Sequence, residues 1–277
     1  MIFYHVKIGE EYRLGCYFFF EGKLLDMDVF EKVGTRVSSR LHSGITRLDE
    51  LISGGFPDNS TILVSGTPGS GKTIMCYHYI QEGLKNDERC LYLTSDERVE
   101  NILKQAGELG FNFSQYVDSG QLDFFYLNLE SGDVYKQMEK KVKENNYNRV
   151  VLDSITPVSE MPFWVSDGAV EIVPSDGFNT TKKIPLDSIS VTRLHVRRII
   201  NILRKENCTC LVTSEIPEGS RGLSRDTISE FMVDGIILMD LDTSMDRRKL
   251  TIRKMRATKH TLKPQDIIID SGGIKFL

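Results

Sequence analysis

Short apolar runs alternate along most of the chain with longer stretches that repeat apolar residues every three to four positions. The short runs are rich in β-branched residues, as buried strands are, and the longer stretches have the spacing of amphipathic helices. Such alternation predicts an α/β fold with a mainly parallel sheet and helices on both faces. The expected order is strand 61–66, helix 72–85, strand 89–97, helix 99–110, strand 121–129, helix 133–146 and strand 149–154.

The alternation is interrupted at about residues 158–190 and then resumes. This stretch, called the excursion below, holds Pro, Gly and Asp with two short apolar runs, and we interpret it as a hairpin. Its tryptophan, Trp164, has two possible uses, burial against the core and a docking point for a partner. The later elements expected are helix 191–207, strand 208–215, loop 217–231 and three antiparallel strands at 235–241, 249–256 and 265–270.

The first 34 residues differ from the rest of the chain. Two short aromatic-rich runs surround a turn, so residues 1–34 are expected to form a hairpin-like extension and residues 35–277 the main domain. Met27 offers an alternative start of translation, in which case residues 1–26 would not belong to the protein.

Composition fits a soluble globular protein. Of the 277 residues, 40% are hydrophobic and 27% charged, and the net charge is -4. Weak acidity does not favour a protein that coats nucleic acid, although a local basic channel stays possible. The five cysteines form no CxxC pair, which favours reduced thiols in the cytoplasm over disulfides or zinc. No apolar run reaches the roughly 18 residues of a membrane helix, so we expect no membrane partner.

The segment GTPGSGKT at residues 66–73 fits the pattern G-x-x-x-x-G-K-[ST] between a predicted strand and a predicted helix. Its glycines let backbone N–H groups converge on phosphate oxygens at a helix N-terminus. Lys72 is expected to reach the β- and γ-phosphates, and Thr73 to bind Mg²⁺ through its hydroxyl. The nucleotide-binding candidates are Gly66, Thr67, Pro68, Gly69, Ser70, Gly71, Lys72 and Thr73.

Polar side chains end three predicted strands, at the edge where α/β proteins place ligands. Asp153 is the candidate to hold Mg²⁺ together with the hydroxyl of the phosphate loop, the alternative being a turn acid. Asp96 and Glu97 are candidates to act on the attacking water, although capping of the next helix would also explain them. Ser214 and Glu215 are weaker candidates for a group that senses the γ-phosphate.

A basic cluster lies near the end of the chain, in TIRKMRATKH at residues 251–260. It admits three interpretations: a nucleic-acid patch, a phosphate site, and a solvated strand edge that carries charge against aggregation. The spacing alone favours the solvated edge.

These motifs together resemble the KaiC-like branch of the RecA superfamily, from about Ser43 to the C-terminus. The resemblance implies a RecA-like fold, ATP and Mg²⁺ as cofactors, and hexameric rings with ATP between subunits. The branch includes bacterial circadian clock ATPases and many single-domain archaeal relatives. The segments that carry the resemblance are 43–73, 91–111, 150–154, 213–225, 230–239 and 253–260.

Two parts of the resemblance concern individual residues. The family has a segment similar to KMRGTxH that contacts the neighbouring subunit's ATP, and Ala257 stands where its glycine would be. Alanine there matters only if the backbone needs a positive φ. The family's acid pair is usually two glutamates, the first catalytic; here the first is Asp96, so Asp96 and Glu97 are kept jointly. The residues that match the trans segment are Lys254, Met255, Arg256, Thr258 and His260.

Three functions remain open. The first is a Mg²⁺-dependent ATPase that forms a ring and acts as an ATP-driven switch on a protein partner. The second is a recombinase paralogue that binds single-stranded DNA, and the third is an ATP-gated interaction module with little turnover. The autokinase activity of the clock protein is not supported, because Glu230 and Phe231 occupy the positions of its adjacent Ser–Thr pair.

Overall fold

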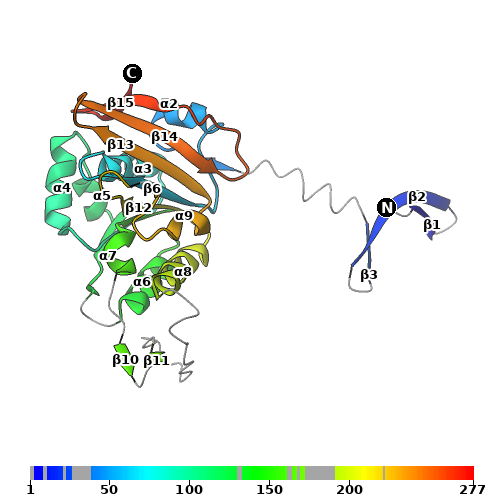
Figure 1. The fold of residues 1–277 in the computed structure, drawn as a ribbon. Helices are drawn as coiled ribbons and strands as arrows, with labels where there is room; N and C mark the ends of the chain where they lie inside the picture. Colours follow the sequence, from blue (N-terminus) through cyan, green and yellow to red (C-terminus); the bar gives the residue numbers. More distant parts are fainter. Residues whose placement is uncertain are drawn as a thin grey trace. The chain divides into compact units, whose positions relative to one another are not determined.

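The computed structural model describes residues 3–8, 11–20, 23–26, 39–129, 133–160, 164–166, 169–171, 191–220 and 222–277. The chain divides into two units, residues 1–39 and 40–277, so the boundary follows residue 39 rather than residue 34. The first unit is an antiparallel sheet of three strands, one more than the sequence pattern predicted (Figure 1). Its strands are β1 (Phe3–Ile8), β2 (Glu11–Phe20) and β3 (Lys23–Asp26).

The main feature of the second unit is a sheet of nine strands in the order β16-β15-β14-β13-β6-β12-β9-β7-β8. Pairs from β13 to β8 are parallel and pairs from β13 to β16 antiparallel, which confirms the predicted α/β class. The three late strands are antiparallel to one another as predicted, and the other edge of β13 pairs in parallel with β6. The strands are β6 (Thr61–Gly66), β7 (Cys90–Thr94), β8 (Leu122–Tyr126), β9 (Arg149–Asp153), β12 (Thr209–Glu215), β13 (Gly235–Asp242), β14 (Arg247–Met255), β15 (Gln265–Asp270) and β16 (Gly273–Phe276).

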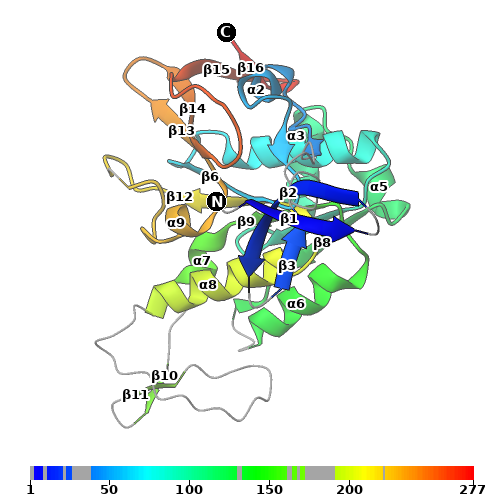
Figure 2. The ribbon, with the colours of Figure 1, turned by 90° about the vertical axis from the view of Figure 1, so that its right-hand side faces the viewer.

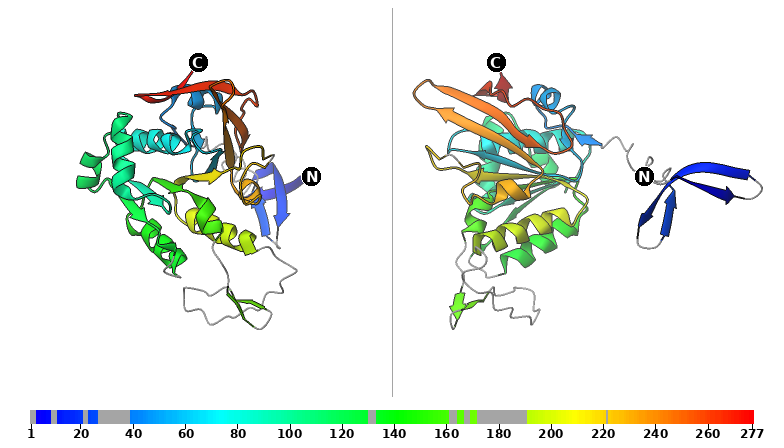
Figure 3. Two further views of the ribbon diagram at one scale, coloured as in Figure 1. Left: turned by 60° about the vertical axis from the view of Figure 1, so that its left-hand side comes forward. Right: turned by 45° about the vertical axis from the view of Figure 1, so that its right-hand side comes forward.

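Helices cover both faces of this sheet (Figures 2 and 3). Alternate residues of the central strands enter two separate cores: Val64 and Val151 belong to one, and Leu63 and Leu152 to the other. This alternation is the period of two expected of a strand that is buried on both faces. The first core is shared with α2 (Thr46–Leu51), α3 (Lys72–Lys85), α4 (Val99–Glu108) and α5 (Ser114–Asp118). The second is shared with α6 (Val134–Glu144), α7 (Ile155–Ser159), α8 (Val191–Arg204) and α9 (Ser229–Met232).

Several short elements had no counterpart in the sequence prediction, because stretches of two to six residues show no clear period. They include α9, which closes the predicted loop 217–231, and the antiparallel pair β4 (Arg40–Leu41) and β5 (Phe56–Pro57). Among the described residues, no helix is long and apolar enough to cross a membrane.

The excursion is described only in part. Its first two residues belong to α7, so the interruption begins later than predicted. Two short strands, β10 (Trp164–Ser166) and β11 (Ala169–Glu171), pair in antiparallel fashion as a hairpin would. The surroundings of Trp164 and most of the stretch up to residue 190 lie outside the described residues, so both uses of Trp164 stay predictions.

Candidate nucleotide site

The phosphate loop, residues 66–73, connects β6 to α3 as predicted. Gly69 and Gly71 have φ of 77° and 105°, which side chains disfavour. A Cβ on Gly66 would lie 2.3 Å from the carbonyl oxygen of Met239 on the neighbouring strand β13. Glycine is therefore required both for the turn and for its close packing. The result is a tight loop ahead of a helix N-terminus, an arrangement that binds phosphate.

The loop also holds polar groups that a polyphosphate could engage. Among the residues that the structure describes, the buried hydroxyls of Thr67 and Ser70 lack a hydrogen-bond partner, an arrangement that costs about 1–3 kcal/mol per group. The Lys72 ammonium donates to the loop's own carbonyls, at 3.0 Å to Gly66 and 3.1 Å to Thr67. Burial lowers the pKa of Lys72, and nearby carboxylates, first that of Glu215, oppose this shift. An added phosphate would favour the charged form of Lys72.

Thr73, at the start of α3, lies beside Asp153, at the end of β9. In the sheet, β12 lies between β9 and β6, the strand that precedes α3. The Thr73 hydroxyl donates to Asp153 at 2.9 Å, and the Tyr92 hydroxyl donates to the same carboxylate at 2.6 Å. The strand that Asp153 ends, β9, is therefore the second strand from β6 in the sheet. Hydroxyl and carboxylate oxygens suit Mg²⁺. No cluster of three or more His, Cys, Asp or Glu that could hold a metal occurs in the described part of the chain, so Mg²⁺ here would need nucleotide and water oxygens.

A cleft of about 260 Å³ opens between the phosphate loop and the ends of β7, β9 and β12. Both members of the predicted catalytic pair line it. The Ser154 hydroxyl donates to Asp96 at 3.0 Å, and Glu97 accepts from the Gln105 amide on α4. The lining residues are Pro68, Gly69, Lys72, Thr73, Thr94, Asp96, Glu97, Ile102, Asp153, Ser154 and Glu215.

The two acids of the pair differ in their surroundings. Burial raises the pKa of Asp96 above the usual range of an aspartate, the Ser154 hydrogen bond lowers it, and the Asp153 and Glu215 carboxylates raise it further. The Glu97 carboxylate accepts from the Gln105 amide on α4, and the Glu97 backbone N–H donates to the Thr94 hydroxyl at 3.3 Å. Asp96 is thus a carboxylate with a raised pKa, and a hydrogen bond from α4 orients Glu97.

Of the two predicted sensor residues, the structure brings only Glu215 to the cleft. Successive side chains of a strand point to opposite faces, and Ser214 is buried, where it accepts the backbone N–H of Arg225 at 3.4 Å. The backbone of Glu215 is held by the Thr156 hydroxyl at 3.1 Å.

Arg248 was not selected from the sequence, yet it lies beside the phosphate loop. Its Nε donates to the Gly69 carbonyl at 3.3 Å. Leu241 on β13 pairs with Arg248 on β14, so the antiparallel turn brings this end of β14 back to the phosphate loop. Sequence reasoning missed Arg248 because its contact joins residues 179 positions apart.

The predicted trans segment, residues 254–260, lies toward the opposite end of the same strands. Met255 pairs with Gly235, and Gly235 pairs with Ile62 near the start of β6, whereas the phosphate loop begins at Gly66. Parallel strands rise about 3.3 Å per residue, so the two levels are roughly 13 Å apart. The segment is therefore carried away from its own subunit's phosphate loop.

The side chains of this segment have different surroundings. Lys254 donates to two carbonyls, at 2.7 Å to Val233 and 3.2 Å to Glu230, and burial lowers its pKa. Arg256 is 55% exposed and pairs with Asp234 at 2.8 Å. The Met255 side chain is buried in its own core, so only its backbone remains for the predicted trans contact.

Arg40 supports the turn that follows β14. Its guanidinium donates to the carbonyl of Ala257 at 3.2 Å and to the Thr258 hydroxyl at 3.1 Å. Ala257 has φ of 52°, so the backbone does require the left-handed conformation that glycine adopts most readily. His260 closes the segment, with Nδ1 3.1 Å from the carbonyl oxygen of Thr258. Sequence reasoning missed Arg40, because more than two hundred residues separate it from its partners.

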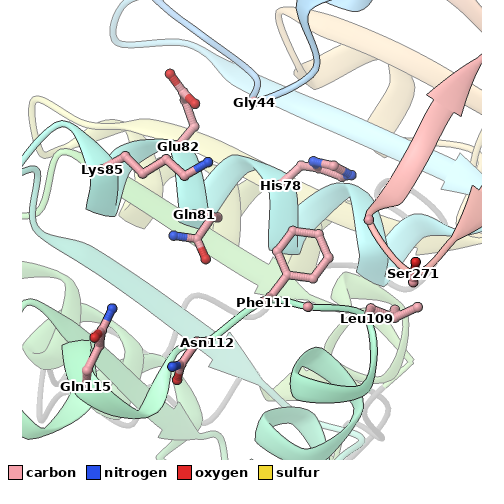
Figure 4. Close-up of a pocket in the computed structure, with 12 residues that line it drawn as sticks. Gly44, His78, Gln81, Glu82, Lys85, Leu109, Phe111, Asn112, Gln115 and Ser271 are labelled. Carbon is pink, nitrogen blue, oxygen red and sulfur yellow. The ribbon is translucent and has the colours of Figure 1, made fainter.

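A second cavity, of about 370 Å³, lies at the far end of α3 and shares no lining residue with the cleft (Figure 4). His78 and Phe111 line it together with polar side chains, among them Gln81 and Gln115. Burial lowers the pKa of His78 to about 4, and its Nε2 accepts the Ile274 N–H at 2.8 Å. His78 is therefore uncharged, and its hydrogen bond connects α3 to β16. We assign it this structural role rather than a role as an acid or base.

Comparison with known proteins agrees with this geometry. The model of the family "ATPase: KaiC" matches residues 41–163 and 180–277, well over half of the chain. The chain belongs to the KaiC family of ATPases. A UPF0273 protein of Methanopyrus kandleri, MK0039, is 30% identical over 85% of this chain and 91% of its own. The circadian clock oscillator protein KaiC of Prochlorococcus marinus is 27% identical over 80% of this chain, a stretch that is 42% of the clock protein.

A solved KaiC-family structure has the same fold. The KaiC-like protein PH0186 from Pyrococcus horikoshii OT3 superposes with a TM-score of 0.70 and 28% identity, covering 87% of this chain and 99% of that one. Membership of the KaiC family and the RecA-like α/β core, both predicted from the motifs, are thereby confirmed.

Proposed function

We propose that the chain is a Mg²⁺-dependent ATPase that assembles into a homo-oligomeric, hexameric ring and acts as an ATP-driven switch on a protein partner. The observation that carries this proposal is the separation of two half-sites within one subunit. The phosphate loop and its cleft lie at one end of β6, and Arg256 lies toward the other end, held by Asp234. In a ring with head-to-tail contacts, each subunit would place its Arg256 against the cleft of the next.

Each half-site supplies a distinct part of the reaction. Lys72 and the loop N–H groups bind the phosphates, and Thr73 and Asp153 hold Mg²⁺, which when bound neutralises charge on the phosphate oxygens. Arg256 of the neighbour would stabilise the charge that develops on those oxygens during transfer.

The acids share the work on the attacking water. We assign proton acceptance to Asp96, because the Ser154 hydroxyl holds its carboxylate at the cleft and burial raises its pKa toward the working pH. Glu97, oriented by Gln105, would position the water. This division also explains why the shorter Asp96 is tolerated, since the water can be placed by the second acid.

The single-stranded DNA alternative has little support from the described surface. Arg225, one of the two arginines of loop 217–231, forms an ion pair with Glu160. Arg221 lies outside the described residues.

Subunit mixing tests the proposal. The Lys72→Ala variant keeps Arg256 but loses phosphate binding, and Arg256→Ala keeps the cleft but loses the trans cation. Each alone should hydrolyse ATP at least about a thousandfold more slowly than the wild type. If mixed subunits assemble at random, about a quarter of the interfaces are intact, and activity should return in that proportion. Mixed oligomers, verified by native mass spectrometry, that stay inactive would refute the trans site.

A further inference from the structure

We infer that Asp234 is a positioning residue for the arginine that each subunit offers to its neighbour, and that Arg204 braces Asp234. This inference rests on the proposed function, since it requires Arg256 to act in trans. Neither Asp234 nor Arg204 was among the residues selected from the sequence.

Asp234 is the anion at the centre of a small network. Its side chain is only 18% exposed, and Oδ1 accepts from Nη1 of Arg256 at 2.8 Å. Nη2 of Arg204 donates to both carboxylate oxygens, at 3.1 Å each, and the Thr61 N–H donates to Oδ2 at 3.1 Å. The carboxylate is thus held from three directions.

The backbone of Asp234 ties this network to the central sheet. Its N–H donates to the Thr61 carbonyl at 2.8 Å, and its carbonyl accepts the Arg256 N–H at 2.9 Å. Thr61 is the first residue of β6, the strand that ends in the phosphate loop. The position of the Asp234 carboxylate, and with it that of the Arg256 head group, is therefore tied to the start of the central strand β6.

Arg256 needs such a restraint. An arginine side chain carries about 2 kcal/mol of rotamer entropy, and a catalytic cation misplaced by about 1 Å can cost a hundredfold in rate. The Asp234 carboxylate accepts from Nη1 of Arg256, and the guanidinium has further donors on Nε and Nη2 that suit a phosphate. Arg256 can therefore stay on Asp234 while it contacts the neighbour's phosphate.

Arg204 gives the network its net charge. Arg204 and Arg256 carry two positive charges, and Asp234 carries one negative charge. The network therefore keeps one net positive charge, which attracts a phosphate. Arg204 also donates to the Met232 carbonyl at 2.6 Å, which fixes it to α9. Without Arg204, Asp234 would cancel the charge of Arg256.

If the Asp234–Arg256 pair only stabilised its own subunit, replacement of Asp234 would act on turnover only through a loss of stability. Ion pairs with an exposed partner contribute roughly 0–1 kcal/mol to stability. Replacement of Asp234 should therefore change turnover at the neighbouring site much more than it changes the thermal midpoint of its own subunit.

Mixed oligomers isolate this effect. Donor subunits carry Lys72→Ala with Asp234→Asn, and acceptor subunits carry Arg256→Ala, so each productive site takes its arginine from a donor without the carboxylate. The reference is the mixed oligomer whose donor carries Lys72→Ala alone. Relative to it, we expect kcat to fall about ten- to a hundredfold, with KM for ATP little changed. Asp234→Glu in the donor should recover part of the rate, because it restores the charge.

A matched control uses Glu139, an acid on α6 that pairs with Lys205 and Lys143 on the surface. Glu139→Gln in the Lys72→Ala donor should leave the mixed rate unchanged. An unchanged rate with the Asp234→Asn donor would overturn the inference while the proposed function stands. So would a loss of rate that is matched by a lower thermal midpoint or a loss of mixed oligomers. If the Lys72→Ala and Arg256→Ala pair itself stays inactive, the proposed function fails and this inference with it.

Discussion

Single residues decide how the two half-sites work, and two of them are held in unusual states. Asp96 is a carboxylate with a raised pKa beside other carboxylates, and Ala257 is an alanine with a left-handed backbone. Both departures from the common pattern of the family, an aspartate for a glutamate and an alanine for a glycine, thus fall at positions with a measurable physical consequence.

Ala257→Gly should stabilise the protein. The left-handed conformation costs an alanine about 1 kcal/mol more than a glycine, and part of this is offset by the greater freedom of glycine in the unfolded chain. We expect a gain of about 0.5–1 kcal/mol in the free energy of unfolding, measured by urea denaturation. A loss of stability would show that the turn carries no such strain.

The pH dependence of turnover should report Asp96. A carboxylate that must be ionised loses activity as the pH falls through its pKa, so a raised pKa moves the acid limb of kcat/KM to higher pH. Ser154→Ala removes a hydrogen bond that lowers this pKa, and it should therefore shift the limb further upward. A limb that stays in place or moves to lower pH would contradict the assignment of Asp96.

At the scale of elements, β13 and β14 organise both half-sites. One end of this hairpin places Arg248 at the phosphate loop, and the other end carries Lys254 and the turn that follows. Arg40, on the short strand β4, holds that turn from outside the sheet. An element of only two residues can thus fix the geometry of the trans segment.

Arg40→Met should impair the trans half-site and spare the other. Loss of its hydrogen bonds to the turn frees residues 257–258, so ATPase activity should fall at least severalfold. Binding of a fluorescent ATP analogue to the variant's own phosphate loop should persist, because Arg40 does not line the cleft at that loop. Equal losses of binding and turnover would indicate general unfolding instead.

At the scale of the whole molecule, assembly should cover the end of the sheet that carries Arg256. Phe231 is 72% exposed on α9, next to Glu230, whose carbonyl accepts from Lys254. Large exposed aromatic side chains of this kind are enriched in protein interfaces. The subunit surface beside the trans cations therefore has an apolar as well as a charged part.

Phe231→Glu should weaken assembly. A buried charge in place of an aromatic ring is unfavourable in an interface, so the variant should show a lower mass by light scattering in the presence of ATP. Glu139→Gln, the surface control on α6, should not change the mass. A full-sized Phe231→Glu oligomer would place the interface elsewhere.

The sequence by itself determined the elements and chemistry that depend on local order. Periodicity predicted the long helices and central strands because each buries a regular set of its own side chains, and GTPGSGKT identified the phosphate loop because its conformation depends on its own glycines. Only the tertiary structure decided which distant groups meet. The Arg248–Gly69 contact, the support of Ala257 by Arg40, and the meeting of Arg204 and Arg256 at Asp234 all join separate strands, helices or loops. Such contacts follow from strand order and register, which hydrophobic spacing does not encode.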